Sequence, residues 1–147
     1  QLAPAQLLAA AQWSAKTGLL DPELHLALLC TAKARSSDFQ ASEIADFVWA
    51  LATVAVSDAV MSESLVSVAL KEQETWDFQR ACNVVWALSL TGHHNLQLLK
   101  ATFERDCSAA SKQEKEYLKQ VLLILRLTQP RLADQLISDA KDLLAEK

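Results

Sequence analysis

The sequence predicts an all-α protein, folded as an α-solenoid of about four antiparallel helix pairs with a repeat of about 37 residues. Three observations predict this fold class. Only 2 Gly and 3 Pro occur in 147 residues, which leaves too few turn-forming residues for many short strands. Hydrophobic residues make up 51% of the chain, and Ala and Leu, both strong helix formers, are prominent among them. The third observation is an internal repeat marked by tryptophan.

The repeat is visible as recurring aromatic pentapeptides. Phe-Val-Trp-Ala-Leu around Trp49 returns as Val-Val-Trp-Ala-Leu around Trp86, 37 residues later. The same interval forward reaches Leu123, and a step of 36 residues back from Trp49 reaches Trp13. A period of roughly 20–50 residues is typical of solenoids, in which each helix pair covers the apolar surface of the next. We therefore expect one helical-repeat domain, 1–147, with units at about 1–36, 37–75, 76–110 and 111–147.

Each unit is expected to contain an A helix, which carries the repeat mark, and a B helix. We predict A helices at about 4–16, 41–55, 79–91 and 112–127. We predict B helices at about 21–35, 58–73, 95–109 and 130–146. Apolar residues recur at helical spacing within them, as Ile44, Val48 and Leu51 do. Gly18 and Gly92 follow A helices, where a left-handed helix end favours a residue without a Cβ.

Local signals predict several helix starts. Asp21 precedes Pro22 as a cap, and Pro22 and Pro130 suit a first helical turn, where the missing N–H of proline has no intrahelical partner to lose. Ser111, followed three residues later by Glu114, predicts a capping box. Because the connections between paired helices are short, the two helices of a pair are expected to be antiparallel.

Large side chains are needed where successive helix pairs meet. The predicted core positions of the repeat are Trp13, Phe39, Trp49, Leu51, Phe78, Trp86, Leu88 and Leu123. Small Ala50 and Ala87 beside the two central tryptophans would let neighbouring helices approach closely. Core packing is the expected role of these two tryptophans, since aromatic residues at helical spacing are usually structural.

The segments around the central tryptophans share a longer pattern. Residues 82–89, Cys-Asn-Val-Val-Trp-Ala-Leu-Ser, and 45–52, Ala-Asp-Phe-Val-Trp-Ala-Leu-Ala, approximate small-Asn-x-x-Trp-Ala-Leu-Ala. This pattern resembles the octotricopeptide and heptatricopeptide repeat families and the related repeats of FAST-kinase-type proteins. Phe39 and Phe78 match the aromatic residue that often opens the A helices of these families. The resemblance covers two units well, whereas the first and last are degenerate, and the chain carries no RAP-type domain.

The resemblance implies an α-solenoid in a mitochondrion or, alternatively, a chloroplast. Members of these families typically bind organellar RNA, and some are architectural parts of organellar ribosomes or other large assemblies. We therefore expect a non-catalytic protein that binds RNA, alone or within a ribonucleoprotein. The alternative is a structural subunit that uses the same solenoid to hold protein partners in an organellar complex.

Two groups of polar residues are candidates for RNA contacts. Repeat proteins that read RNA present polar side chains from successive repeats, and the repeat interval aligns Asp46, Asn83 and Gln120. The alternative role of Asn83 is to brace neighbouring backbone, because buried polar groups need partners. A basic strip is expected near the starts of the third and fourth A helices: Arg80, Lys112, Lys115 and Lys119. Its alternative is a solvated helix face, diluted by Glu114 and Glu116.

Composition bounds the remaining function classes. The net charge is −4, from 14 basic and 18 acidic residues, which is not the charge field of a strong nucleic-acid binder. The 3 cysteines are scattered without metal-ligand spacing and indicate a reducing compartment. No catalytic spacing or glycine-rich phosphate loop is present, so we expect no enzyme activity, cofactor, metal or small-molecule substrate. No apolar run is long enough for a membrane span.

The two ends of the chain carry further expectations. It begins at Gln1 rather than Met, as a processed protein or a piece of a longer one would, so a targeting peptide can have been removed. The last helix is amphipathic, with an apolar side formed by Leu132, Leu136, Ile137, Leu143 and Leu144. It could close the stack, or its acidic side could favour a protein neighbour.

Overall fold

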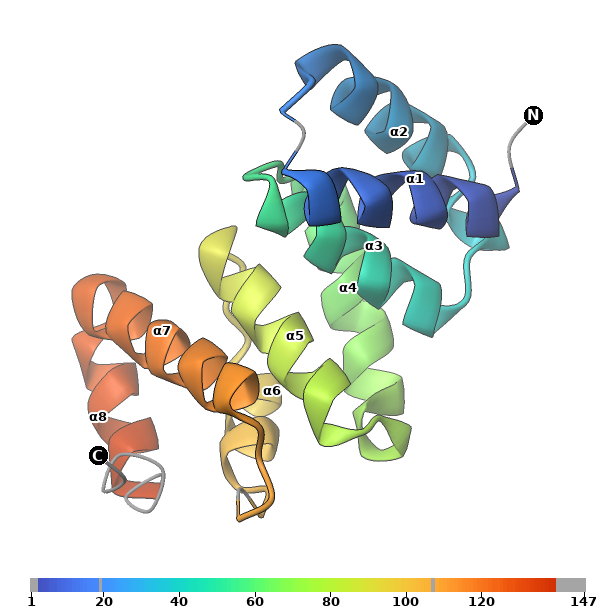
Figure 1. Cartoon of the computed structure of the whole chain (residues 1–147). Coiled ribbons are helices and arrows are strands. Elements are labelled where there is room, and N and C mark those ends of the chain that lie inside the picture. Colours follow the sequence, from blue (N-terminus) through green and yellow to red (C-terminus); the bar gives the residue numbers. More distant parts are fainter. Residues whose placement is uncertain (1–2, 19, 107, 140–147) are drawn as a thin grey trace. The chain divides into compact units, whose positions relative to one another are not determined.

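The computed structural model describes residues 3–18, 20–106 and 108–139, and every regular element in these ranges is helical (Figure 1). This confirms the predicted all-α class. The eight α-helices of the described residues are α1 (Pro4–Thr17), α2 (Pro22–Ala34), α3 (Ala41–Thr53), α4 (Ala59–Glu72), α5 (Phe78–Leu90), α6 (Leu96–Phe103), α7 (Lys112–Thr128) and α8 (Pro130–Asp139). Two short 3-10 helices, η1 (Ser36–Asp38) and η2 (Gln73–Thr75), precede α3 and α5.

The helix starts follow the predicted local signals. Asp21 Oδ1 accepts hydrogen bonds from the N–H groups of Glu23 and Leu24, at 3.1 and 3.2 Å, and thereby caps α2. Ser111 and Glu114 form the predicted capping box at the start of α7, with bonds of 2.8 and 3.2 Å. These residues satisfy N–H groups that a helix cannot pair internally, which explains why the helices begin there.

Three A helices end in the same way, with a residue in the left-handed conformation. Gly18, Ala55 and Gly92 have φ angles of 64°, 60° and 76°. The two predicted glycines therefore lie where expected, and Ala55 adopts the same conformation despite its Cβ. The N–H of Val56 and the N–H of His93 then close the two later turns by bonding back to helix carbonyls at 2.9 Å.

The third B helix is shorter than predicted. α6 ends at Phe103 instead of continuing to about residue 109. Arg105 turns away from the helix, and its guanidinium donates to the carbonyl oxygens of Trp76, at 2.7 Å, and Gln73. Asp106 Oδ1 then accepts from the Ser108 N–H at 2.9 Å and forms a tight turn. The fourth B helix was expected to reach about residue 146; Leu143 and Leu144 lie outside the described residues.

The chain divides into two compact units, residues 1–69 and 70–147. In unit 1, α1 packs against α2 and α3. Its buried apolar side chains include Leu7, Ala11, Leu28, Leu29, Ala32, Ile44, Phe47, Val48, Leu51, Met61 and Leu65. The rings of Phe39 and Phe47 meet edge to face, with centroids 5.9 Å apart, so the residue that precedes α3 is anchored in this core.

In unit 2, α5 packs against α6 and α7, and α8 packs against α6 and α7. Its buried apolar side chains include Trp76, Val84, Val85, Trp86, Leu88, Leu98, Leu99, Phe103, Leu118, Val121, Leu122, Leu125, Ala133 and Leu136. In both units, therefore, two successive A helices are in direct contact, α1 with α3 and α5 with α7.

Two predicted core positions are wrong, because Trp13 is 55% exposed and Leu123 is 57% exposed. Trp49 and Trp86 are each the ninth residue of their helix, whereas Trp13 is the tenth residue of α1. A shift of one position along a helix turns a side chain by about 100° around the helix axis, and this shift moves Trp13 off the buried side. Leu123 is the twelfth residue of its helix, because α7 begins sooner after α5 than α5 begins after α3.

The core position predicted at Phe78 is only partly correct. Phe39 is buried and follows η1, but Phe78 is only half-buried as the first residue of α5. The residue that follows η2 in the way that Phe39 follows η1 is Trp76, which is 7% exposed. The matching tripeptides Asp-Phe-Gln concealed this relationship, because the interval between them is longer than the interval between the first residues of α3 and α5.

Candidate functional site

The contact between α5 and α7 is built on Trp86. Its ring stacks on the ring of Tyr117, with centroids 4.4 Å apart and planes inclined by 13°. Its Nε1–H donates to Gln120 Oε1 at 2.8 Å. Trp86 is 8% exposed, whereas Tyr117 is half-buried and Gln120 is exposed. One tryptophan therefore joins two helices and fixes two side chains at the surface of unit 2.

The alignment of Gln120 with Asn83 and Asp46 is corrected by the helix starts. Asp46 and Asn83 are each the sixth residue of their helix, but Gln120 is the ninth residue of α7. Gln120 thus occupies the place in α7 that Trp86 occupies in α5. Asn83 is half-buried between buried Cys82 and Val84, and Asp46 is half-buried in unit 1.

Three predicted basic residues lie on one side of α7. Lys112, Lys115 and Lys119 are spaced three and four residues apart, which places them on consecutive turns of the same helix face. Arg126, seven residues after Lys119, extends this side by two turns and was missed by sequence reasoning. From Lys112 to Arg126 the basic strip of α7 is about 21 Å long, at 1.5 Å of rise per residue.

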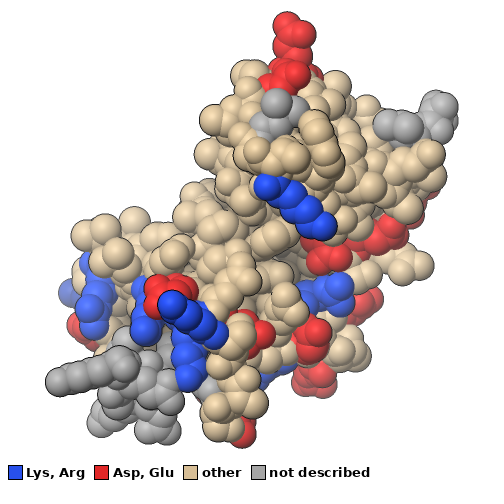
Figure 2. Space-filling model, in the orientation of Figure 1, with Lys and Arg blue, Asp and Glu red and all other residues tan. Residues whose placement is uncertain are grey.

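Acidic groups lie among these cations. Figure 2 shows Lys and Arg side chains gathered over the part of unit 2 that α7 occupies, with acidic side chains among them. Lys119 Nζ is 3.7 Å from Glu116 Oε1, and both side chains are well exposed. An ion pair of this length at the surface holds neither group firmly, so Lys119 remains available to an anionic ligand.

Arg80 does not belong to the basic strip of α7, because it lies on another helix. It lies in the first turn of α5 and is half-buried, and its backbone N–H donates to Asp77 Oδ1 at 2.8 Å. Four cations were predicted to cluster near the starts of the third and fourth A helices. The strip of α7 instead contains three of them together with Arg126.

The remaining central tryptophan has a different environment. Trp49 is half-buried on α3, and among the described residues its Nε1 atom is buried with no hydrogen-bond partner. A buried N–H without a partner is unusual in a native protein, because no new hydrogen bond offsets the loss of its contact with water.

Leu51 and Leu88, two residues after the central tryptophans, are both buried.

A buried hydrogen bond joins α1 to α2. Ser14 Oγ lies 2.5 Å from His25 Nε2, and both residues are almost fully buried. A serine and histidine at this distance resemble a nucleophile and its base, but a catalytic pair needs access to a substrate. Exposed fractions of 1% and 3% exclude such access in this conformation. The hydrogen bond instead gives each of these two buried side chains a partner in place of the water it loses when α1 packs against α2.

The two histidines of the α5–α6 turn lie at the edge of the unit 2 core. Burial and the neighbouring His93 lower the pKa of His94 below its ordinary value of 6.5. His94 Nδ1 is buried without a hydrogen-bond partner among the described residues. The surrounding space, lined by Val85, Leu88, Ser89, Asn95, Leu98 and Leu99, has no room for a water molecule. This environment favours the neutral ring and offers no volume for a ligand.

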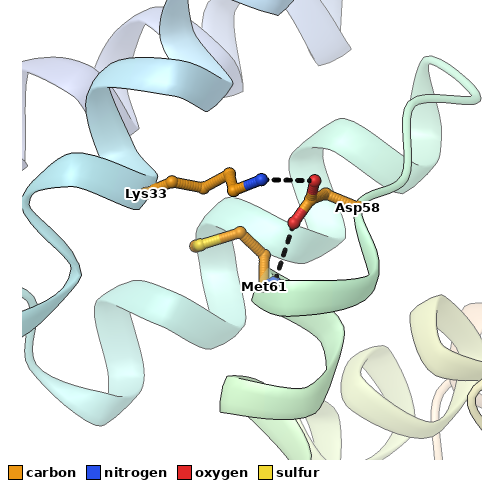
Figure 3. Close-up of polar contacts among 3 residues, drawn as sticks. All are labelled: Lys33, Asp58 and Met61. Atoms are coloured by element: carbon orange, nitrogen blue, oxygen red, sulfur yellow. Dashed lines mark hydrogen bonds and ion pairs between the residues drawn. The ribbon is translucent and has the colours of Figure 1, made fainter.

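An ion pair in unit 1 was also missed from the sequence. Figure 3 shows Asp58 between Lys33, at the end of α2, and Met61, in the first turn of α4. Asp58 Oδ2 is 3.0 Å from Lys33 Nζ, and Asp58 Oδ1 accepts from the Met61 N–H at 3.0 Å. Burial alone would raise the pKa of Asp58, but the N–H groups and the Lys33 charge outweigh it and lower the pKa below 3.8.

No protein-family model, no curated protein and no solved structure matches the chain. Among the described helices, none combines the length and the apolar character that a membrane crossing requires.

Proposed function

We propose that the chain is an α-solenoid repeat protein that binds single-stranded RNA along α7. The observation that carries this proposal is the basic strip of Lys112, Lys115, Lys119 and Arg126 on one side of that helix. Contacts to phosphates supply most of the affinity of RNA-binding proteins, and a row of cations about 21 Å long can follow a sugar-phosphate backbone. The overall charge of −4 disfavours RNA contacts elsewhere on the chain, so we place the binding at this strip.

The positions of the helices support a solenoid with a 37-residue repeat. α1, α3 and α5 begin at residues 4, 41 and 78, and α2, α4 and α6 begin at residues 22, 59 and 96, so the same interval separates successive members of each set. The left-handed residues Gly18, Ala55 and Gly92 keep the same spacing. Successive A helices are in contact within each unit, as they are in stacked helix pairs. The last pair departs from this regularity, because it begins at Lys112, sooner than the interval would place it.

The organellar part of the proposal depends on the resemblance of residues 45–52 and 82–89 to octotricopeptide and heptatricopeptide repeats. We propose a role in a mitochondrion, with a chloroplast as the alternative, on RNA or within a ribonucleoprotein. The test of this part is the location of the tagged full-length protein in cells. A protein found outside both organelles would contradict it.

A salt-dependent binding titration tests the RNA proposal. The wild-type chain is titrated with a uridine oligonucleotide at two salt concentrations, beside a variant with Lys112, Lys115 and Lys119 changed to Gln. We expect the variant to bind more weakly, and the slope of log affinity against log salt to fall by about 2, since each phosphate contact contributes about 0.7 for a single strand. A control with Lys16, Lys71 and Lys100 changed to Gln has the same net charge. Equal losses in both variants, or no binding by the wild type, would contradict the proposal.

A protein scaffold is the second candidate, and exposed leucines favour it. Leu123 and Leu127 are one turn apart on α7 and are 57% and 78% exposed. Exposed apolar side chains close together can mark a surface for a partner. Wild-type protein that binds no RNA but co-purifies with a defined partner, and loses it on Leu123→Ser and Leu127→Ser, would support this candidate.

A further inference from the structure

The hydrogen bond between Trp86 and Gln120 fixes the orientation of a surface amide. An indole Nε1–H can only donate, so the Gln120 atom that lies 2.8 Å from it must be the amide oxygen. This settles which end of the amide is oxygen, an assignment that otherwise depends on the wider hydrogen-bond network. Because Oε1 accepts from Trp86, the amide has a fixed direction, and its Nε2 group carries the N–H donors that other partners can use.

Two further contacts make this orientation rigid. The ring of Trp86 is stacked on Tyr117 at 4.4 Å, and the Tyr117 hydroxyl is bonded to Gln113 Nε2 at 3.1 Å. Trp86 is 8% exposed, so its ring is held by packing on the remaining sides. Because Gln120 is already held in one orientation, its Nε2 donor loses little side-chain entropy when it binds a ligand.

Gln120 is an exposed residue, and among the described residues its Nε2 group has no hydrogen-bond partner. Its sequence neighbour Lys119 belongs to the basic strip of α7, about 100° away around the helix axis. Glu116, one turn before Gln120 on the same helix, has its Oε1 atom 3.7 Å from Lys119 Nζ. A strand whose phosphates contact the strip would therefore reach this donor with groups that extend to the Gln120 side of the strip.

We propose that Gln120 is a fixed hydrogen-bond donor that binds an acceptor atom of the RNA lying along α7, with Trp86 as its positioning residue. This inference rests on the proposed function. The acceptor is an oxygen or nitrogen of a base edge, or an oxygen of a phosphate, and in both cases the ligand atom carries a lone pair. Trp86 occupies one of the two lone pairs of the Gln120 oxygen and fixes the amide, so the Nε2 donors of Gln120 are presented in a defined direction.

The test removes the donor without changing charge. Gln120→Met keeps the length of the side chain and loses the amide, and Gln97→Met is the matched change at an exposed glutamine on α6. Both variants are titrated with a uridine oligonucleotide and with an abasic oligonucleotide of the same length. We expect Gln120→Met to weaken binding roughly three- to tenfold, as the loss of one hydrogen bond would, with an unchanged salt slope. Gln97→Met should bind as the wild type does.

The two oligonucleotides distinguish the sources of the acceptor. A loss on the uridine oligonucleotide alone places the acceptor in a base, and a loss on both places it in the phosphate backbone. Wild-type binding that Gln120→Met leaves unchanged on both would overturn the inference while the proposed function stands. A wild type that binds neither oligonucleotide overturns both.

A double-mutant cycle tests the positioning role of Trp86. Trp86→Phe retains an aromatic ring against Tyr117 but removes the N–H that fixes the amide. If Trp86 acts through Gln120, the loss caused by Gln120→Met should be at least halved in the Trp86→Phe background. A structural role alone would lower stability and leave the effect of Gln120→Met on RNA affinity unchanged. Additive effects of the two substitutions would overturn the positioning role.

Discussion

Lys33 and Asp58, 25 residues apart in the chain, lie 3.0 Å from each other between the end of α2 and the start of α4. The same carboxylate accepts the Met61 N–H in the first turn of α4. Asp58 therefore stabilises a helix start and an ion pair at once, and the two contributions differ in kind. A helix cap acts through a hydrogen bond to backbone, whereas an ion pair at a partly exposed site is weakened by water and salt.

Removal of either partner should separate these contributions. We expect Asp58→Ala to lower the free energy of unfolding by about 1 kcal/mol, because an N–H of the first turn loses its acceptor. Lys33→Ala should lower it by about 0.5 kcal/mol or less, because Lys33 is 37% exposed. Urea denaturation followed by far-UV circular dichroism measures both. A larger effect for Lys33→Ala would mean that the ion pair dominates over the cap.

The lowered pKa of Asp58 predicts a dependence of stability on acid. Since the pKa in the folded chain lies below 3.8, the unfolded chain takes up the proton first as the pH falls. The contribution of Asp58 is thus present above the unfolded pKa and is lost as the pH falls through the folded value. The unfolding free energy of the wild type should decline between about pH 5 and pH 3, a range of roughly one unit on either side of the ordinary pKa of aspartate. In Asp58→Asn this decline should be less steep. Parallel pH profiles for the wild type and this variant would contradict the assignment.

His94 should make unit 2 sensitive to mild acid. Its pKa in the folded chain is below 6.5, so the unfolded chain binds a proton more readily when the pH falls past that value. The stability contribution of the neutral ring is present above the unfolded pKa and declines as the pH falls toward the folded one. His94→Gln should reduce the loss of stability between about pH 7 and pH 5.5. Thermal melts at these two pH values, with His93→Gln as the control, measure the effect.

The control for His94 has a defined expectation of its own. His93→Gln removes the neighbouring imidazole but leaves the burial of His94, the larger cause of its lowered pKa. Most of the acid sensitivity should therefore persist in His93→Gln. If His93→Gln removed it and His94→Gln did not, the sensitivity would belong to His93.

Ala55 predicts a substitution that stabilises the protein. Its φ of 60° is left-handed, a conformation that costs an L-residue roughly 1 kcal/mol and costs glycine almost nothing. Ala55→Gly should therefore raise the free energy of unfolding by up to about 1 kcal/mol. Ala9→Gly, at an exposed position inside α1, should instead lower it by roughly 0.5 to 1 kcal/mol. Destabilisation by both changes would contradict the strain at Ala55.

Helix positions were predictable where the signal is local. Pro22 with Asp21, and Ser111 with Glu114, each place a helix start through residues within one turn of each other. The end of α6 was not predictable in this way. It depends on Arg105, whose guanidinium reaches the carbonyl of Trp76, 29 residues away. No pattern in residues 95–109 records such a contact.

In the candidate site too, features that depend on nearby residues were predictable, and features that depend on packing were not. The spacing of Lys112, Lys115 and Lys119 was sufficient to place them on one helix face, because helical periodicity is local. The place of Gln120 was misassigned, because it depends on the start of α7, which follows the start of α5 by less than the interval between the two central tryptophans. The hydrogen bond between Gln120 and Trp86 joins α7 to α5 and depends on how these two helices pack, which a single sequence does not specify.

The unequal exposure of the tryptophans makes them natural optical reporters. Trp13, which is 55% exposed, should emit at long wavelength and be quenched readily by acrylamide. Trp86, which is 8% exposed and stacked on Tyr117, should emit at shorter wavelength and be shielded from the quencher. Since Trp13 lies in unit 1 and Trp86 in unit 2, the emission spectrum of a chain with Trp49 and Trp76 changed to Phe would record the loosening of each unit without an added dye.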